Sequence, residues 1–283
     1  FQAPDIAGQA KLLQQKRQPW TPLVCLQPNG DMAPLFCIHA VAGNVLCYQE
    51  LSRHIGRQRP FYGLQAPDID SGAHPGGIEE LAALYIAAIR SVQAQGPYHL
   101  GGWSMGGVIA YEMAGQLQQA GEQVGTLTLI ESYTPEAVQA FEQEYLDKNL
   151  LPCDDGETLL LTMFARELGL DDAEAMPDQA TAASGLTRRL DALFNQAKHA
   201  GLLPEDIDSA QLYRLFSVFE ANVRAMNRYV PGQYRGDVRL LHAGSANQEY
   251  ANGGWAELIN GDLSIEAVPG DHYSILRQPN VQF

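Results

Sequence analysis

The chain has 283 residues, of which 46% are hydrophobic and 18% are charged. This composition predicts a folded protein with a sizeable core, because disordered chains show the opposite balance. The formal net charge of -15 disfavours binding to phosphate backbones and anionic lipid surfaces. We therefore expect neither nucleic acid nor a membrane as a partner.

The apolar runs stay below the roughly 20 residues that span a bilayer, and the first residues lack the pattern of a secretion signal. We therefore expect a cytoplasmic protein. The four cysteines are spaced unlike metal ligands, so we expect buried free thiols and no metal site. These are Cys25, Cys37, Cys47 and Cys153.

Residues 1–20 are polar and rich in glutamine, and a proline-bounded break follows a possible short helix at 7–16. The first residue is phenylalanine, and the chain ends where a further helix is expected to begin. We interpret the sequence as a domain of a longer polypeptide, with residues 1–20 as a linker from an upstream domain and residues 21–283 as one folded unit.

From residue 21 onward, short apolar runs alternate with segments of helical periodicity. This alternation predicts an α/β fold with a mostly parallel central sheet flanked by helices. The expected strands are residues 21–27, 34–40, 61–65, 98–103, 126–131, 238–243 and 263–268. The expected helices between the early strands are residues 44–55, 78–95 and 106–121.

The alternation stops at about residues 134–232, where helical patterns occur without a strand candidate. The expected helices there are residues 157–170, 184–200 and 210–230. Long connections in compact domains are usually functional, and this one leaves the carboxyl end of a strand, where α/β proteins bind ligands. We interpret it as a helical lid; a separate helical domain without a role at the site is the alternative.

Ser104 lies in Gly102-Trp103-Ser104-Met105-Gly106, which matches G-x-S-x-G between an expected strand and an expected helix. This is the setting of the nucleophile in the α/β-hydrolase fold, where the tight turn exposes the serine hydroxyl and the glycines allow the strand and helix to approach. The alternative is a glycine-rich turn that only joins two elements. We expect Ser104 to be the nucleophile.

A serine hydroxyl needs a neighbouring base. His272 follows the last expected strand, which fits the chain order serine, acid, histidine of this fold, whereas His39 precedes the serine and His242 follows the wrong strand. We expect His272 to be the general base.

Two strand ends could supply the acid that holds the imidazole. Glu131 directly follows the strand next after Ser104 and lies on the same expected edge of the sheet. We favour Glu131 over Glu249, which follows a later strand, and over Asp271; a surface glutamate at a loop start is the alternative for Glu131.

The reaction also needs backbone N–H groups directed at the oxyanion of the transition state. The residue after the nucleophile, Met105, is one expected donor. The loop after an early strand should give the other, and we expect it to be Val41 in the small-residue segment 38–44.

Several segments together resemble the thioesterase domains that end nonribosomal peptide synthetases and polyketide synthases. They are residues 23–55, 59–70, 98–114, 127–133 and 268–276, and the likeness covers nearly the whole chain after residue 20. Most members of that family carry aspartate at the position of Glu131, and many carry His-Pro where this chain has His39-Ala40. Glutamate places its carboxylate one methylene further out, and backbone donation does not require the proline.

The resemblance implies a mobile helical lid and an acyl chain delivered on the phosphopantetheine arm of an upstream carrier domain, with no cofactor bound by this domain itself. We therefore expect a Ser104 acyl-enzyme that is resolved by hydrolysis or by macrocyclisation. The alternatives are a free-standing editing thioesterase, an esterase for small diffusible esters, and an inactive binding module with the same fold. The length of the N-terminal tract and the absence of a starting methionine favour the chain-terminating type over the editing type.

Overall fold

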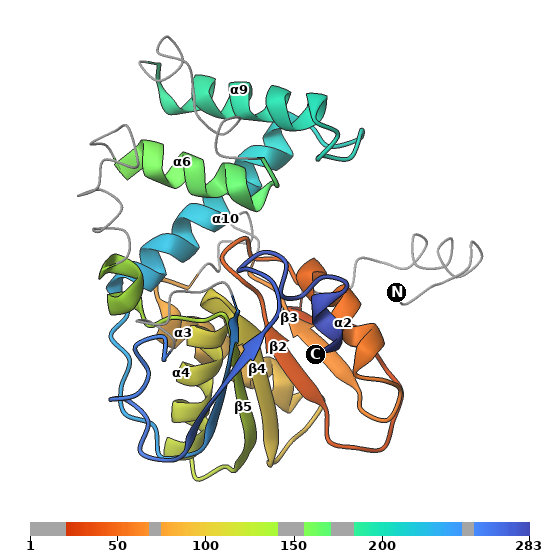
Figure 1. Cartoon of the computed structure of the whole chain (residues 1–283), viewed down its shortest axis with the longest axis vertical. Helices are drawn as coiled ribbons and strands as arrows, with labels where there is room; N and C mark the ends of the chain where they lie inside the picture. The colour runs from red at the N-terminus through yellow and green to blue at the C-terminus, as the bar shows by residue number, and fades with distance from the viewer. Residues whose placement is uncertain (1–20, 68–74, 141–155, 171–183, 245–251) are drawn as a thin grey trace.

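The computed structural model of the protein describes residues 21–67, 75–140, 156–170, 184–244 and 252–283. It is built around a central sheet (Figure 1). Seven strands of these ranges form it in the order β1-β3-β2-β4-β5-β6-β7. Their bounds are β1 Leu23–Gln27, β2 Leu35–Ile38, β3 Phe61–Leu64, β4 Tyr98–Trp103, β5 Val124–Ile130, β6 Val238–Ala243 and β7 Leu263–Val268. β1 is antiparallel to β3, and all other neighbours are parallel. All seven expected strands and the mostly parallel sheet are confirmed.

Helices cover both faces of the sheet because side chains along each strand alternate between two cores. In β2, Phe36 and Ile38 pack in one core with α3 (Ile78–Arg90) and α4 (Met105–Gln119). Cys37, between them, points to the other core, which includes Tyr48 and the segment after β7. Both faces of the central strands are therefore covered, as is usual for parallel sheets, whereas the edge strand β7 is largely exposed.

The region 44–55, which the periodicity predicts as one helix, is divided in the structure. A short 3-10 helix, η1 (Leu46–Tyr48), precedes α2 (Gln49–His54). The Asn44 side chain accepts a hydrogen bond from the Leu46 N–H at 3.0 Å, so the chain begins with a turn rather than with regular helix. The chain end is also not a regular helix: turns follow β7, and η4 (Asn280–Gln282) is a 3-10 helix.

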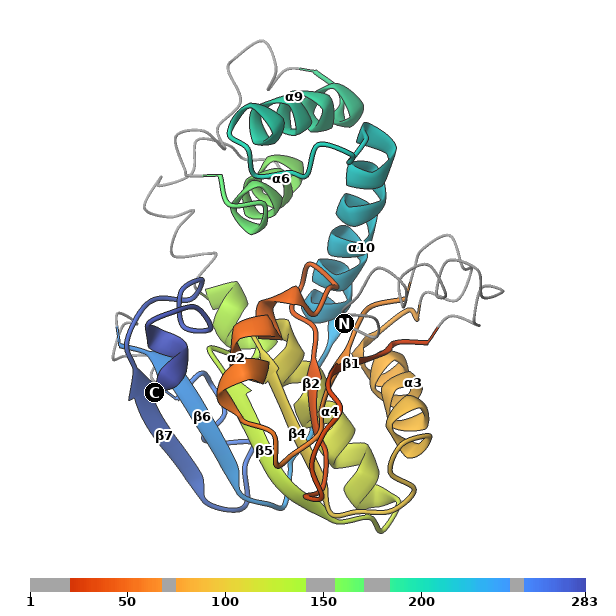
Figure 2. The same ribbon diagram turned by 90° about the vertical axis from the view of Figure 1, so that its right-hand side faces the viewer.

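Between β5 and β6 a helical insertion rises beyond one end of the sheet (Figures 1 and 2). It contains α6 (Gly156–Glu167), α9 (Leu186–His199) and α10 (Ser209–Arg228), which confirm the three helices expected there. These helices share a hydrophobic core of their own. α10 starts with a capping box between Asp208 and Gln211 and runs from this core down to the sheet (Figure 2).

Parts of the expected organisation fall outside the described residues. These are the linker 1–20 with its short helix, two stretches of the insertion (141–155 and 171–183), Cys153 and the alternative acid Glu249. Of the cysteines within the described ranges, Cys37 is buried, whereas Cys25 and Cys47 are only partly buried; all three are free. None of the helices in the described ranges combines the length and the apolarity needed to cross a bilayer.

Candidate active site

Ser104 occupies a strained turn between β4 and α4. Its backbone has φ 56° and ψ -129°, a conformation that residues other than glycine adopt rarely and at a cost of about 1–3 kcal/mol. The neighbouring glycines make this turn possible. A Cβ on Gly102 would collide with the backbone of Gly106, and a Cβ on Gly106 would collide with the Ile38 carbonyl.

The sheet register places Glu131 beside this turn. Trp103 pairs with Ile130 at the ends of β4 and β5, so Ser104 and Glu131 are the next residues along neighbouring strands. The Ser104 N–H donates to the Ile130 carbonyl at 2.9 Å. Glu131 is itself in the left-handed region, with φ 45°, which turns the chain away from the sheet.

Both oxygens of the Glu131 carboxylate have hydrogen-bond partners, and Glu131 is only 3% exposed. Oε2 lies 3.2 Å from His272 Nδ1, and Oε1 accepts the Ala243 N–H at 2.5 Å. The Tyr133 hydroxyl is a weaker donor to the same carboxylate, at 3.4 Å from Oε1. The structure therefore brings together Glu131 and His272, which are 141 positions apart in the sequence.

Burial alone would raise the pKa of Glu131. The hydrogen bonds from His272 and Ala243, with smaller contributions from the His272 charge and Tyr133, outweigh it and hold the pKa below its ordinary value. Glu131 is therefore ionised at neutral pH and can only accept hydrogen bonds. His272 Nδ1 must carry the proton, so the neutral ring presents Nε2 as an acceptor.

His272 lies in a turn after β7 that is fixed from two sides. The Trp103 indole N–H donates to the His272 carbonyl at 3.0 Å, and the two rings lie 5.2 Å apart. Asp271 does not contact the imidazole as an acid partner: its Oδ1 accepts the Tyr273 and Ser274 N–H groups at 3.0 and 2.9 Å. This alternative acid is a cap of the turn.

The imidazole of His272 therefore packs against Trp103, the residue directly before Ser104. The structure records no hydrogen bond from the Ser104 hydroxyl to another described residue. Such bonds in hydrolases often form only when substrate is bound.

The loop after β2 is built around His39, which is completely buried. His39 Nδ1 donates to the Ala40 carbonyl at 2.7 Å, and Nε2 shares a hydrogen bond with the Tyr85 hydroxyl at 2.6 Å. The Ala40 carbonyl also accepts the Gly43 N–H at 2.9 Å. Because C=O and N–H of one trans peptide point in opposite directions, these bonds fix the direction of the Val41 N–H.

The helical insertion contacts the same loop through α10. The Asn222 side chain donates to the Val41 carbonyl at 2.8 Å, and Asn222 is completely buried. Gly43 has φ 81°, and a Cβ at this position would collide with the Val218 side chain of α10. Val41 itself packs against both the main core and the core of the insertion.

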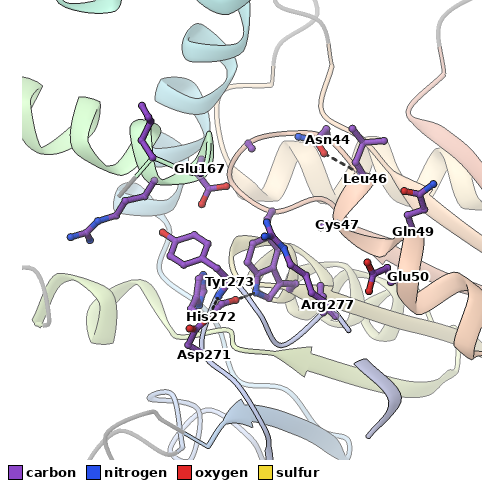
Figure 3. Close-up of a pocket in the computed structure, with 17 residues that line it drawn as sticks. Asn44, Leu46, Cys47, Gln49, Glu50, Glu167, Asp271, His272, Tyr273 and Arg277 are labelled. Atoms are coloured by element: carbon purple, nitrogen blue, oxygen red, sulfur yellow. Dashed lines mark hydrogen bonds between the residues drawn. The ribbon is translucent and has the colours of Figure 1, made fainter. Parts of the chain in front are cut away.

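A cavity of about 1280 Å³ lies between the insertion and the sheet edge (Figure 3). Trp103 and His272 form part of its wall, together with Ala40 of the loop after β2. Glu167, at the end of α6, lines it from the insertion. Among the described residues no three His, Cys, Asp or Glu side chains gather as metal ligands would.

Some residues of this site have no signal in the sequence pattern. Tyr48 donates to the Ile38 carbonyl at 2.5 Å and accepts the Trp103 N–H at 2.8 Å, so it joins two strand ends below the site. Tyr133 and Asn222 likewise gain their contacts only from tertiary folding. Trp103 also gains its contact with His272 only from tertiary folding, although it lies inside G-x-S-x-G.

The sheet order, the strained serine turn after β4 and the Glu131–His272 pair at the same edge define an α/β hydrolase. The family model described as "Thioesterase domain" matches residues 33–282. The chain therefore belongs to the thioesterase domain family.

Two comparisons link this domain to larger proteins. A dimodular nonribosomal peptide synthase of Bacillus subtilis (strain 168) is 32% identical over 270 residues, which are 93% of this chain and 10% of that protein. A solved four-domain nonribosomal peptide synthetase, bound to AMP and glycine, has 30% identity and a TM-score of 0.82 over 97% of this chain and 20% of its own. This chain thus spans only a small part of either protein.

A third comparison supports the fold. The NocB thioesterase domain, solved as a covalent complex with a fluorophosphonate nocardicin G analogue, has a TM-score of 0.61 and 24% identity. The match covers 92% of this chain and 94% of that one. The same architecture therefore extends over nearly the whole of an isolated thioesterase domain.

Proposed function

We propose that this domain releases an acyl or peptidyl chain that an upstream carrier domain presents as a phosphopantetheine thioester. The observation that carries the proposal is the Glu131–His272 pair, held at 3.2 Å beside the strained turn of Ser104. In this arrangement His272 Nε2 takes the proton of the Ser104 hydroxyl while the oxygen attacks the thioester carbonyl. The ionised Glu131 stabilises the imidazolium that forms.

The first half-reaction ends when the C–S bond breaks and the arm thiolate leaves with the proton from His272. The acyl group then remains as an ester on Ser104. In the second half-reaction, water or a hydroxyl or amine of the same chain loses a proton to His272 and attacks that ester; the acyl C–O bond to Ser104 then breaks, and His272 returns the proton to the serine oxygen. Hydrolysis gives an acid, and internal attack gives a macrolactone or a lactam.

Two backbone groups are proposed to bind the oxyanion. The Met105 N–H is at the start of α4, where helical N–H groups have no partner within the helix. The Val41 N–H is the second donor, and its direction is supported by the His39 and Gly43 bonds to the Ala40 carbonyl. Donors that are already oriented cost no reorganisation when the charge develops.

The helical insertion is proposed to act as the lid at about residues 134–232. The cavity beneath it would enclose the acyl chain and limit the access of water, which favours internal attack over hydrolysis. Residues 1–20 would be the tether to the carrier domain. The synthases among the relatives support a carrier as the partner, since a release domain needs a chain to release.

A fluorophosphonate probe followed by mass spectrometry tests the nucleophile. We expect one adduct on the wild-type domain, at Ser104, and none on Ser104→Ala. An unlabelled wild-type protein whose Glu131 and His272 are intact would favour an inactive binding module.

A rate comparison tests the substrate. We expect a higher kcat/KM for a carrier-loaded peptidyl thioester than for a small diffusible ester with the same acyl group. Equal values would favour a general esterase, and a preference for acetyl-loaded over peptidyl-loaded carrier would favour an editing thioesterase.

A further inference from the structure

A carboxylate of the helical insertion faces the cavity that contains His272. Glu167 is the last residue of α6 and lines the cavity together with His272 and Tyr273 (Figure 3). In the figure its carboxylate projects from the insertion into the space above those two residues. Burial raises the pKa of Glu167, and the nearby imidazole acts in the opposite direction. The group therefore lies near the proposed catalytic histidine, in a partly buried position.

The other two carboxylates of this cavity already have partners. Glu50 Oε2 accepts the Gln278 N–H at 2.6 Å, and Asp271 caps the turn that carries His272. Glu167 differs from them, because the structure records no hydrogen bond or ion pair between its carboxylate and another described residue.

A partly buried carboxylate without a partner on the wall of a cavity can bind an entering cation through a charge-assisted hydrogen bond. The acyl chain is the group that must enter, because its carbonyl has to reach Ser104 beside His272. Glu167 is on the insertion side of the same cavity, above His272 and Tyr273. A side-chain or terminal ammonium of the chain can therefore reach Glu167 while the thioester is at the serine.

We propose that Glu167 is the binding site for an ammonium group of the acyl chain, so that the substrate class is an aminoacyl or peptidyl thioester that carries a basic amine. This inference rests on the proposed function. It assigns to the insertion a role in substrate selection through charge, in addition to enclosing the chain.

Three thioesters of similar size test the selection. They carry ornithine, norleucine or glutamate as the residue next to the thioester, so that the side chain ends in an ammonium, a methyl or a carboxylate group. We expect the ornithine substrate to have the highest kcat/KM for the wild-type domain. In Glu167→Gln its kcat/KM should fall about 10- to 100-fold, the range of a hydrogen bond between charged partners, while the norleucine substrate keeps its rate.

Glu205→Gln is the matched control, because Glu205 is an exposed carboxylate of the same insertion. It should leave the order of the three substrates unchanged. The proposal is overturned if Glu167→Gln keeps the ornithine preference. It is also overturned if Glu167→Gln slows all three substrates equally, since the carboxylate then acts on His272 rather than on the substrate.

Binding measurements separate this inference from the proposed function. In a Ser104→Ala background, calorimetry with amide analogues of the ornithine and norleucine substrates reports affinity without turnover. Tighter binding of the ornithine analogue that disappears in Ser104→Ala/Glu167→Gln supports the ammonium site even if the wild-type domain hydrolyses no thioester. Equal affinity for both analogues, beside normal thioester turnover, overturns the ammonium site and leaves the release function intact.

Discussion

Glu131 shows how one residue can have a structural and an electrostatic task at once. Its positive φ costs free energy, and the backbone and side-chain bonds to β6 and His272 compensate for it. The residue lies at the end of β5, where the chain leaves the sheet. A strand-end residue with this backbone and this burial is suited to hold the imidazole in one tautomer.

Replacing Glu131 with glutamine tests this role. We expect Glu131→Gln to lower kcat by a factor on the order of 10⁴, as in serine proteases whose acid becomes an amide, because an amide can present its NH₂ group to Nδ1 and favour the wrong tautomer. Steady-state rates on a thioester measure the effect. Glu249→Gln is the control and should keep a near-normal rate. Equal losses in both variants would show that Glu131 is not the acid partner of His272.

The pH dependence of stability gives a second test. The pKa of Glu131 is below its ordinary value of about 4.5 in the folded protein, so its contribution to stability is complete above about pH 4.5 and is lost as the pH falls through the folded pKa. Glutamine does not titrate. Urea unfolding from pH 7 to pH 3 should therefore show a steeper decline for the wild-type protein than for Glu131→Gln in the acidic range. Parallel curves would contradict the lowered pKa.

At the residue scale, the sequence predicts the places of the site residues in the fold, whereas their catalytic roles stay predictions. Ser104 follows from G-x-S-x-G at a strand end, and Glu131 and His272 follow from their places after strands. Contacts between distant segments have no such signal: Tyr133 on Glu131 and the Trp103 indole on the His272 carbonyl are visible only in the folded protein.

The turn from β4 into α4 is the element on which the site depends most. Gly106 faces the carbonyl groups of Ile38 and His39, whereas Gly115, on the same helix, has open space at its Cα. We expect Gly106→Ala to destabilise the fold by more than about 2 kcal/mol, since backbone must move. Gly115→Ala should stabilise it by about 0.5–1 kcal/mol. Denaturant unfolding measures both, and similar values would contradict the close packing.

The contact between α10 and the loop after β2 predicts that the insertion supports catalysis. Asn222→Ala removes the donor to the Val41 carbonyl, so the loop gains freedom and kcat should fall severalfold with little change in KM. Asn227→Ala, at an exposed position of the same helix, is the control. If KM rises in Asn222→Ala and kcat stays constant, Asn222 serves substrate binding instead.

The elements themselves were largely predictable because each has a clear periodicity. Period-two alternation and short apolar runs located all seven strands, and the three helices of the insertion were found from their spacing. The division of 44–55 into η1 and α2 was missed, because it depends on the side-chain turn at Asn44. The order of strands in the sheet also needs the folded protein, since periodicity carries no pairing information.

At the scale of the whole molecule, the insertion is a second packing unit with its own core. Phe164 is 2% exposed, and its ring lies 5.2 Å from that of Phe216 and 5.3 Å from that of Phe219. Phe164→Ala should cost about 3–5 kcal/mol in this core. Hydrogen exchange should then rise in α6, α9 and α10 and stay unchanged in β4.

Leu215→Ala, at an exposed position of α10, is the control for that experiment. Faster exchange in β4 of Phe164→Ala would show that the two cores unfold together. In that case the packing of Val41 against both cores couples their unfolding.

The position of Glu131 on β5 has a consequence for engineering. The serine and its acid belong to one strand-helix-strand unit, 27 positions apart, and β6 holds Glu131 through two backbone groups, the Ala243 N–H and the Leu241 carbonyl. β6 therefore supports the pair without a side chain of its own, and its exposed Arg239 can be exchanged without the loss of a group that the proposed chemistry uses.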